Sequence, residues 1–494
     1  MNILIASSEA VPFAKSGGLA DVAGALPMEL AKLGHETRLI LPAYRNVQYR
    51  GLPIEDLDID FIIPIGSKTV TGRLFESHLP YGAGSVPVTL IGQDHYYLRD
   101  ELYAIDGKDY IDNCERFIFF SRAVLEAIRL LDIPVDVIHA NDWQTGLVPA
   151  FLKTEYRSIP RYENIATLFT IHNMAYQGQF WHWDMLLTGL DWKYFNWHQM
   201  EFHGRLNLLK TGIVFADSIS TVSPRYAKEI QSAPFGCGLE GTLHQRRDRL
   251  HGILNGMDAE AWNPETDEFI AENYDAGSFV EGKAACKAAL QREVGLPERR
   301  DVPLVGFVGR LCEQKGIDLI HALIGQWVQE TDLQWVILGT GEPQYHALFE
   351  KLAAQHPRKV AVRLEFSNPL AHRIEAGTDI FLMPSRFEPC GLSQLYSLRY
   401  GSIPIVHATG GLVDTIVNAD PQTLASGSAN GFSFREYTPS AFSDALRCAC
   451  TLFGQADRWR RLVRYGMNQD WSWAQSAKRY VELFETTVQR ARNA

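Results

Sequence analysis

Short runs of β-branched and apolar residues alternate with longer stretches of helical period along this chain. Six such runs lie in the first half and five in the second, separated by segments long enough to hold a helix. Parallel strands need a crossover connection, usually a helix, so this alternation is typical of βαβ units around a parallel sheet. The pattern predicts an α/β fold. The expected strands are 2–7, 36–41, 86–92, 136–140, 165–171, 218–223, 303–309, 334–339, 360–366, 379–384 and 403–407.

The two series of strands indicate two domains. A chain of 494 residues is too long for one hydrophobic core. The stretch 255–267 between the series holds glycine, asparagine and proline, as linkers do. We expect a Rossmann-like domain over 1–254, a second over 255–472, and a final helix over 473–494 that packs back on the first domain. The two domains are expected to face a central cleft, where open parallel sheets bind ligands.

Composition excludes several classes of protein. The net charge of −11 argues against nucleic acid as the main partner. No apolar run approaches the ~20 residues of a membrane helix, and the amino terminus does not resemble a signal peptide. The seven cysteines show no zinc-like spacing, so we expect reduced thiols, no metal and a cytoplasmic protein. The oligomeric state stays open.

Two glycine pairs stand just ahead of expected helices, in "KSGGLAD" (15–21) and "TGGLVD" (409–414). Glycines at the start of a helix let backbone N–H groups approach an anion closely, and the helix dipole favours negative charge there. Lys15 adds a cation two residues before the first pair. The alternative is a glycine turn that binds nothing, and the spacing of this motif alone does not decide between the two.

Two further segments carry charge at the ends of expected strands. "GRLCEQKG" places Arg310 and Lys315 after the strand 303–309, where they could bind phosphate. "SRFEPCGLSQLY" places Glu388 after the strand 379–384, where a carboxylate could contact a sugar and stabilise positive charge at its anomeric carbon. The alternatives are a solvated helix end and a solvated loop glutamate.

Polar side chains also follow two strands of the first series. "HANDWQTG" holds Asp142 and Trp143, and "TIHNMAYQG" holds His172 and Asn173. Their equivalent places after neighbouring strands favour a functional site over inert core histidines. The aromatic-rich stretch 180–202 could stack on sugar rings, but packing is the favoured interpretation.

Taken as an ordered set, these motifs resemble the glycogen and starch synthase family of retaining glycosyltransferases. The motifs are "KSGGLADVAGALP", "HANDWQTG", "TIHNMAYQG", "LNGMD", "GRLCEQKG", "PSRFEPCGLSQLY" and "TGGLVDT", and they span the chain from residue 1 to about 485. The resemblance implies a two-domain fold of the GT-B type. It also implies transfer of glucose from ADP-glucose to the non-reducing end of an α-1,4-glucan such as glycogen, with retention of configuration and no metal or organic cofactor.

The resemblance assigns roles to residues by their place in these motifs. Glu388 would sit beside the donor glucose and His172 would contact the transferred sugar, with Arg310 and Lys315 completing the catalytic group. The donor diphosphate would be held by Lys15, Gly17, Gly18, Arg310, Lys315, Thr409, Gly410 and Gly411. The acceptor and sugar would be contacted by Glu9, Asp142, Trp143 and Asn173.

The sequence departs from the family pattern in small ways and leaves rivals open. Ser16 replaces a more frequent threonine, and Gln144 stands where a histidine is common. Tyr396 occupies the place of a second glutamate found in many related transferases, which favours a glycogen synthase. The rivals are a retaining transferase with a small acceptor and a sugar-nucleotide epimerase. Same-face attack and a covalent intermediate on Glu388 are both open.

Overall fold

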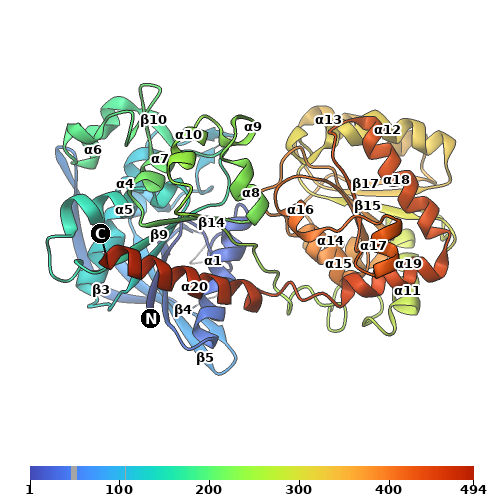
Figure 1. Ribbon diagram of the computed structural model, residues 1–494, viewed down its shortest axis with the longest axis horizontal. Coiled ribbons are helices and arrows are strands. Elements are labelled where there is room, and N and C mark those ends of the chain that lie inside the picture. The colour runs from blue at the N-terminus through green and yellow to red at the C-terminus, as the bar shows by residue number, and fades with distance from the viewer. Residues whose placement is uncertain (46–52, 106, 494) are drawn as a thin grey trace. The chain divides into compact units, whose positions relative to one another are not determined.

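The computed structural model describes residues 1–45, 53–105 and 107–493, and the chain divides into two compact units. Unit 1 comprises Met1–Asn255 and Trp473–Ala494, and unit 2 comprises Gly256–Ser472. Each unit is built around one large sheet with parallel strands at its centre, flanked by helices (Figure 1). The expected α/β class and the two Rossmann-like sheets are confirmed.

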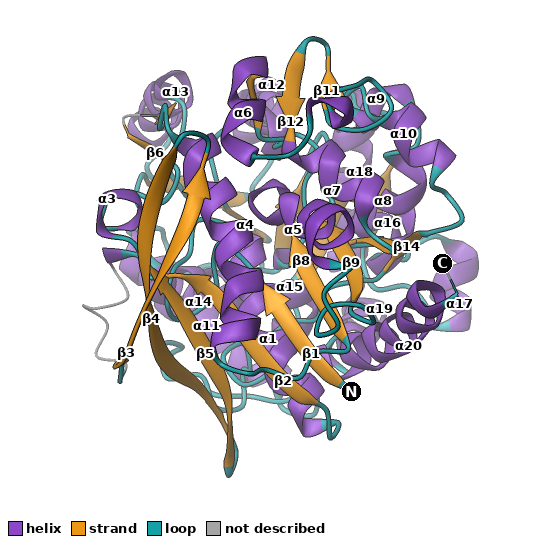
Figure 2. Ribbon diagram, turned by 90° about the vertical axis from the view of Figure 1, so that its left-hand side faces the viewer, coloured by secondary structure: helices purple, strands orange, loops and turns teal. Residues whose placement is uncertain are grey.

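Unit 1 contains a nine-stranded sheet whose central strands are parallel (Figure 2). Every strand expected in this half of the chain is present. In spatial order the strands are β14 (Leu250–Gly252), β13 (Ser218–Thr221), β9 (Ala166–Ile171), β8 (Val137–Asn141), β1 (Asn2–Ala6), β2 (Glu36–Pro42), β5 (Gly84–Gly92), β4 (Lys68–Tyr81) and β3 (Glu55–Ile65). The central strands are buried on both faces, as their continuous apolar runs require.

Helices cover both faces of this sheet. α1 (Gly18–Lys32) and α20 (Trp473–Arg492) contact each other, and α20 also packs on β9, so the last helix of the chain belongs to unit 1 (Figure 1). A second layer is made by α4 (Asn113–Leu130), α5 (Leu147–Phe151) and α7 (Leu208–Phe215). Smaller elements are α3 (Asp94–Tyr97), α6 (Met185–Thr188), α8 (Pro224–Glu229), α9 (Ala233–Gly236), α10 (Glu240–Gln245), β6 (Ala104–Ile105), β7 (Lys108–Asp109), β10 (Gln179–Trp181), β11 (Glu201–Phe202) and β12 (Arg205–Asn207).

Pro27 lies inside α1. A proline at an internal position usually bends or breaks a helix, but α1 continues through Pro27 to Lys32. Proline removes one backbone donor from the helix. The apolar face of α1 stays buried on both sides of Pro27, at Val22, Leu26 and Leu30, and this packing holds the helix together.

Unit 2 contains a six-stranded parallel sheet. Its spatial order is β17 (Val360–Arg363), β16 (Gln334–Leu338), β15 (Leu304–Val308), β18 (Ile380–Met383), β19 (Ile403–His407) and β20 (Phe432–Phe434). The helices around it are α11 (Phe279–Val294), α12 (Ile317–Glu330), α13 (Pro343–Gln355), α14 (Asn368–Gly377), α15 (Ser393–Tyr400), α16 (Gly410–Thr415), α17 (Pro421–Ser426), α18 (Pro439–Phe453) and α19 (Ala456–Met467). No helix among the described residues of either unit is long and apolar enough to cross a membrane.

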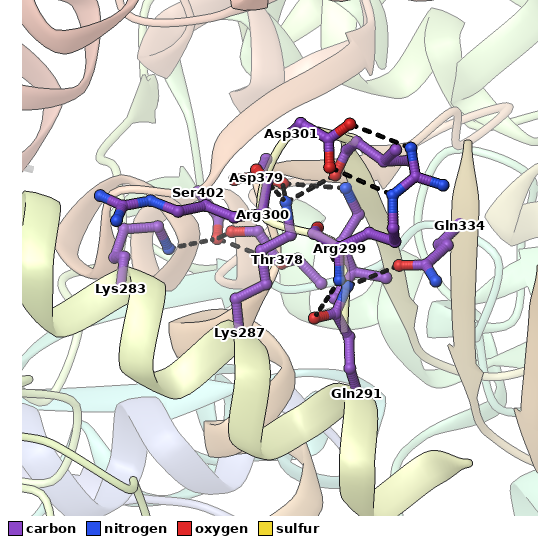
Figure 3. Close-up of polar contacts among 12 residues, drawn as sticks. Lys283, Lys287, Gln291, Arg299, Arg300, Asp301, Gln334, Thr378, Asp379 and Ser402 are labelled. Carbon is purple, nitrogen blue, oxygen red and sulfur yellow. Dashed lines mark hydrogen bonds and ion pairs between the residues drawn. The ribbon is translucent and has the colours of Figure 1, made fainter. Parts of the chain in front are cut away.

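Two lysines of α11 fix the amino-terminal edge of the unit 2 sheet (Figure 3). Lys287 Nζ lies 2.7 Å from Asp379 Oδ2, and the same oxygen accepts a hydrogen bond from the backbone N–H of Leu304. Lys283 donates to the carbonyls of Ala376 and Tyr400, which lie at the carboxyl ends of α14 and α15. Burial lowers the pKa of Lys283 to about 8. Buried polar contacts therefore stabilise the amino-terminal edge of this sheet, which is opposite the edge where the predicted site residues follow the strands.

Candidate active site

The loop after β1 lies at the point where the strand order of unit 1 reverses. From β1 the chain passes to β2 on one side of the sheet, and it later returns to β8 on the other side. Ligands of open α/β sheets bind at such a switch point, beyond the carboxyl ends of the strands. Lys15 and the first glycine pair follow β1, and Asp142 follows β8. The structure thus brings two of the predicted segments to one edge.

The carboxylate of Glu9 organises the first glycine loop. It accepts hydrogen bonds from the backbone N–H groups of Ser16, at 2.5 Å, and Gly17, at 3.1 Å, and from the Ser16 hydroxyl at 2.7 Å. Tyr103 donates to the same carboxylate across 3.0 Å. Glu9 is 4% exposed, so this network is enclosed. Glu9 was expected on the acceptor side, and its carboxylate is here engaged with the first glycine loop.

The loop leaves its cation and its glycines accessible. Lys15 is about half exposed and pairs with Asp21 at 2.7 Å. Among the described residues, leaving aside the chain neighbours, no heavy atom lies within 4 Å of a Cβ placed on Gly17 or Gly18, and Gly17 has an ordinary extended φ of −151°. Neither packing nor backbone strain requires glycine here. A physical reason for glycine that these observations leave is the close approach of a ligand to the backbone.

Tyr103→Phe is expected to raise the KM for the donor that the resemblance implies about 10-fold, with a smaller change in kcat. The hydroxyl fixes Glu9, and a hydrogen bond to a charged group contributes ~1.5–3 kcal/mol, part of which orients the loop. Steady-state kinetics would measure the effect, with Tyr110→Phe as the matched control, since the Tyr110 hydroxyl donates to the carbonyl of Glu101 at an exposed position. An unchanged KM would mean that Tyr103 does not position the loop.

Asp142 and His172 lie together beyond β8 and β9. Asp142 Oδ1 accepts a hydrogen bond from the backbone N–H of His172 at 2.7 Å. Asp142 has a left-handed φ of 55°, which is uncommon outside glycine, and burial raises the pKa of its carboxyl to about 7. A strained backbone and a shifted carboxyl in one residue are typical of functional sites.

His172 is held as a neutral imidazole. Its Nε2 lies 2.9 Å from Asn141 Oδ1, while Asn141 Nδ2 donates to the carbonyl of Ala6. The amide oxygen of Asn141 therefore faces Nε2, which must carry the proton, and Nδ1 is left as the acceptor nitrogen. Burial lowers the pKa of His172 to about 3. A neutral nitrogen of this kind can accept a hydrogen bond from a sugar hydroxyl.

The stability of unit 1 is expected to fall as the pH drops below about 6.5. Burial lowers the pKa of both His139 and His172 to about 3, against about 6.5 in an unfolded chain. Between these values the unfolded chain binds more protons, so the free energy of unfolding decreases by up to about 1.4 kcal/mol per pH unit per histidine. The raised pKa of Asp142 acts in the opposite sense, so variants must be compared with the wild type.

His172→Gln should therefore flatten this pH dependence. Calorimetric scans at pH 5, 6 and 7 should show a smaller loss of the unit 1 unfolding temperature in the variant than in the wild type. His244→Gln is a suitable control, because His244 lies near the protein surface in α10. Parallel curves for wild type and His172→Gln would contradict a neutral buried His172.

Trp143 and Asn173 occupy different surroundings at this edge. The ring of Trp143 is only 8% exposed and packs against Phe117 and Phe180, with centroids 4.9 and 5.6 Å apart. Asn173 is partly exposed, and its Oδ1 accepts from the backbone N–H of Ala175. Trp143 thus builds the wall of the site by packing, and contact of either residue with a sugar stays a prediction.

The candidate site of unit 2 also lies at a switch point, between β15 and β18. The chain runs from β15 through β16 to β17 on one side, then crosses to β18, β19 and β20 on the other. Lys315 Nζ is 2.6 Å from Glu388 Oε2, and the Ser385 hydroxyl donates to the same oxygen at 3.0 Å. The Arg310 guanidinium is exposed and donates to Gln314 at 3.1 Å. Lys315 and Glu388 therefore meet although 73 residues separate them, and Arg310 lies five residues before Lys315.

The second glycine pair is required by packing. A Cβ on Gly410 would lie 2.0 Å from the carbonyl oxygen of Glu388, and Gly410 has a left-handed φ of 46°. A Cβ on Gly411 would lie 2.2 Å from the carbonyl oxygen of Cys390. Gly411 also donates its N–H to the Glu388 carbonyl. With the buried Thr409, the pair supports the loop that carries Glu388, and its contact with phosphate stays a prediction.

Several residues of these sites have no short motif that marks them. Ser385 and Tyr103 orient the two carboxylates, and Asn141 sets the tautomer of His172. Phe366, in the loop after β17, is 89% exposed near the carboxyl edge of the unit 2 sheet, where its ring is free to stack on a planar group. Phe366 is the last residue of the expected strand 360–366, and an aromatic residue at the carboxyl end of a predicted strand is the signal that could have marked it.

The chain was compared with known proteins. The family described as "Starch synthase catalytic domain" matches residues 2–245, and "Glycosyl transferases group 1" matches residues 291–461. A glycogen synthase of Syntrophotalea carbinolica is 48% identical over 99% of both chains. The chain belongs to the glycogen and starch synthase family. A glycogen synthase of Rhodopirellula baltica is likewise 46% identical over 99% of this chain and 98% of its own length.

The solved structures agree with this family. The catalytic domain of starch synthase IV from Arabidopsis thaliana, bound to ADP and acarbose, matches over 99% of both chains with a TM-score of 0.89 and 34% identity. A sucrose-phosphate synthase from Thermosynechococcus elongatus shares the fold, with a TM-score of 0.59 and 16% identity. This glycogen synthase family member is thus a glycosyltransferase with a GT-B fold.

Proposed function

We propose that this protein transfers glucose from ADP-glucose to the non-reducing end of an α-1,4-glucan, with retention of configuration. The observation that carries the proposal is the contact of Lys315 with Glu388 at the switch point of unit 2, with Arg310 in the same loop as Lys315. A carboxylate for sugar hydroxyls and two cations for phosphate suit a nucleotide sugar. ADP bound to the related starch synthase IV supports ADP-glucose as the donor.

In unit 2, Arg310 and Lys315 would neutralise the donor diphosphate. An ammonium carries three N–H donors, so Lys315 can keep its contact with Glu388 and still donate to phosphate oxygens. Glu388 Oε1 would be available to a hydroxyl of the donor glucose, because the contacts of Lys315 and Ser385 are both to Oε2. Negative charge grows on the departing ADP, and preorganised cations stabilise that change most. Thr409, Gly410 and Gly411 would complete the phosphate site.

In unit 1, Lys15, Gly17 and Gly18 would contact the diphosphate from the other sheet. Nδ1 of the neutral His172 would accept a hydrogen bond from a hydroxyl of the transferred sugar. The remaining residues of this edge, Glu9, Asp142, Trp143 and Asn173, would shape the acceptor side. The network of Glu9 with the glycine loop supports a second role for that residue in positioning the donor loop.

We propose that the acceptor attacks from the same face that the diphosphate leaves. The bond between the anomeric carbon and the diphosphate oxygen breaks, the bond to the acceptor oxygen forms, and the acceptor proton passes to the departing ADP. An ion pair with Lys315 makes Glu388 a poor nucleophile, since its charge is already engaged. Detection of a glucosyl adduct on Glu388 by mass spectrometry would overturn this route.

One radiolabel assay tests the proposed reaction. ADP-glucose and UDP-glucose, labelled in the sugar, are offered with and without glycogen. Label should enter polymer from ADP-glucose only when glycogen is present. A labelled product of fixed small size would indicate a small acceptor, and conversion of UDP-sugar without any acceptor would indicate an epimerase. Either result would refute the proposal.

We also propose that the enzyme works in the cytoplasm and needs no cofactor. All seven cysteines are free thiols, as is usual in a reducing compartment. Within the parts of the chain that the structure describes, no group of three His, Cys, Asp or Glu side chains is placed to hold a metal ion. Full activity after treatment with a chelator would agree with this proposal, and a loss restored by a divalent cation would refute it.

A further inference from the structure

Cationic side chains from three parts of unit 1 meet at the amino-terminal edge of its sheet. They come from the π-helical stretch Leu152–Tyr156 and the residue after it, from the segment 246–249 ahead of β14, and from the last turn of α20. Hereafter called the basic cluster, they are Lys153, Arg157, Arg246, Arg249 and Arg490. The predicted site residues follow the carboxyl ends of the strands, so the basic cluster lies at the opposite edge.

Arg246 and Arg249 contact the chain where α7 ends. The Arg246 guanidinium donates to the carbonyls of Val214 and Ala216, and the Arg249 guanidinium donates to the carbonyl of Asp217 at 3.2 Å. Nε of Arg246 is buried and has no hydrogen-bond partner among the described residues. Buried donors without an acceptor are rare in native proteins, so this place calls for an acceptor that the chain does not supply.

Arg490 and Lys153 contact the chain where β13 begins. Arg490 donates to the Ser218 hydroxyl at 3.0 Å and to the carbonyl of Asp248 at 3.0 Å. Lys153 Nζ lies 3.1 Å from Asp217 Oδ1. The stretch that these two cations and the two arginines above contact, from the end of α7 to the start of β13, spans at most ~17 Å even when extended. The four cations therefore converge on a small area.

The basic cluster carries more positive charge than its surroundings neutralise, although the whole chain has a net charge of −11. Within the described part of the chain, two carboxylates pair with it. Asp217 pairs with Lys153, and Asp248, which is 73% exposed, lies 3.8 Å from Arg249. The carboxyl ends of α7 and α20 add about half a negative charge each. The five cations therefore keep an excess of about two positive charges.

The cations are close enough to repel one another. Burial lowers the pKa of Arg246 to about 10, and the charges of Arg249 and Arg490 act in the same direction. Burial also lowers the pKa of Lys153, and the charges of Arg246 and Arg157 add to that effect. Like charges held at this distance disfavour the charged forms, and a bound anion relieves their repulsion.

Capping of helix ends does not account for the whole cluster. Arg246 caps α7, and Arg157 caps α20 by donating to the carbonyl of Ala491 at 2.8 Å. One cation at each carboxyl end is enough for that role. A guanidinium has five N–H donors, and the contact with Ala491 is the one that the described residues give to Arg157. Arg249 is 38% exposed, so an anion can reach the donors that remain.

We propose that the basic cluster binds a phosphoryl dianion, as free phosphate or a phosphate monoester, and that the bound anion ties α20 to the rest of unit 1. Guanidinium forks match phosphate oxygens in geometry, and a dianion matches the excess charge. The contact stretch of ~17 Å offers far less than the ~800 Å² that a protein partner needs, which argues against an acidic protein as the ligand. The proposal is independent of the proposed function.

Calorimetry on the full chain tests the site. The unfolding temperature of unit 1 is measured in sodium phosphate and in sodium chloride of equal ionic strength, and isothermal titration gives the Kd for phosphate. Phosphate at ten times its Kd should raise the wild-type temperature by about 3 °C. In Arg157→Gln/Arg249→Gln the Kd should rise at least about 10-fold and the temperature shift should disappear. Tighter binding of glucose 1-phosphate would indicate a monoester as the ligand, and equal or weaker binding would indicate free phosphate.

Matched variants separate binding from misfolding. Arg157→Lys/Arg249→Lys keeps both charges but loses the guanidinium forks, so its Kd should lie between those of the wild type and the glutamine variant. Arg460→Gln/Arg461→Gln removes the same charge from exposed positions of α19 in unit 2, and its Kd should equal that of the wild type. Lys315→Gln should also keep the temperature shift, because the candidate site is elsewhere.

Four results would overturn the proposal. The first is no greater stabilisation of the wild type by phosphate than by chloride. The second is an equal shift in Arg157→Gln/Arg249→Gln, since phosphate stabilises folded proteins in general by exclusion from their surface. The third is loss of the shift in Lys315→Gln, which would place the anion in the candidate active site. The fourth is displacement of phosphate by a polyglutamate peptide at equal charge concentration, which would indicate a docking surface for acidic proteins.

Discussion

Lys315→Gln is expected to lower kcat about 10³-fold. In the proposed mechanism the ammonium stabilises the departing diphosphate, and loss of one such donor typically costs 10²–10³ in rate. The same change leaves the carboxylate of Glu388, which is 9% exposed, without its counter-charge. Breaking a pair of this kind should also lower the free energy of unfolding of unit 2 by about 2 kcal/mol, less than for a fully buried pair because Lys315 is 24% exposed.

The double variant Lys315→Gln/Glu388→Gln separates the two effects. It removes both charges, so the unfolding temperature of unit 2 in calorimetry should recover toward wild type, while kcat should stay at the level of the poorer single variant. Arg386→Gln serves as control, since Arg386 lies in the same loop as Glu388 but pairs with Asp318. A kcat within tenfold of wild type for Lys315→Gln would show that this lysine does not hold the leaving group.

Alanine substitutions in the two glycine pairs are expected to have different effects: loss of stability in the second pair, and weaker donor binding with normal stability in the first. In Gly411→Ala the new methyl would lie 2.2 Å from a backbone oxygen, which cannot move without displacing the Glu388 loop. We expect unit 2 to lose more than about 3 kcal/mol of stability, as overpacking against backbone does. In Gly17→Ala the methyl has open space, so stability should change by less than about 0.5 kcal/mol.

The activity of Gly17→Ala carries the second half of this prediction. The methyl occupies the place where a diphosphate would approach the backbone, so the KM for ADP-glucose should rise at least about 10-fold. Calorimetry and steady-state kinetics on both variants measure the contrast. Gly34→Ala is no substitute as control because of its left-handed φ, and Gly325→Ala, with open space in α12, is the better one. Normal kinetics in Gly17→Ala would favour a glycine turn that binds nothing.

The sequence predicted the parallel core of each sheet better than its antiparallel edge. Strands such as β8 and β15 are buried on both faces and appear as continuous apolar runs. The hairpin of β3 and β4 was missed, although exposed and buried positions alternate in the second half of β3. That alternation with period two is the signal of a half-exposed edge strand. A search for runs alone overlooks it.

The sequence placed the site residues at strand ends but could not show which of them touch. Lys315 and Glu388 were expected near a phosphate and a sugar, and their direct contact follows from the adjacency of β15 and β18. The network of Glu9 with Tyr103 joins residues 94 apart in the chain, which no spacing rule connects. Convergence of unit 1 and unit 2 residues on one nucleotide sugar stays a prediction.

Because α20 belongs to unit 1, this unit can complete its fold only after the carboxyl-terminal end of the chain has been synthesised. α20 covers β9 and β8, with Tyr480 and Phe484 packed on His139. A ribosome synthesises all of unit 2 before it synthesises this helix, so one face of the unit 1 sheet stays uncovered until synthesis is complete. We therefore infer that a fragment ending at Asn255 would aggregate and be degraded rapidly. Supplying α20 as a separate peptide should rescue it.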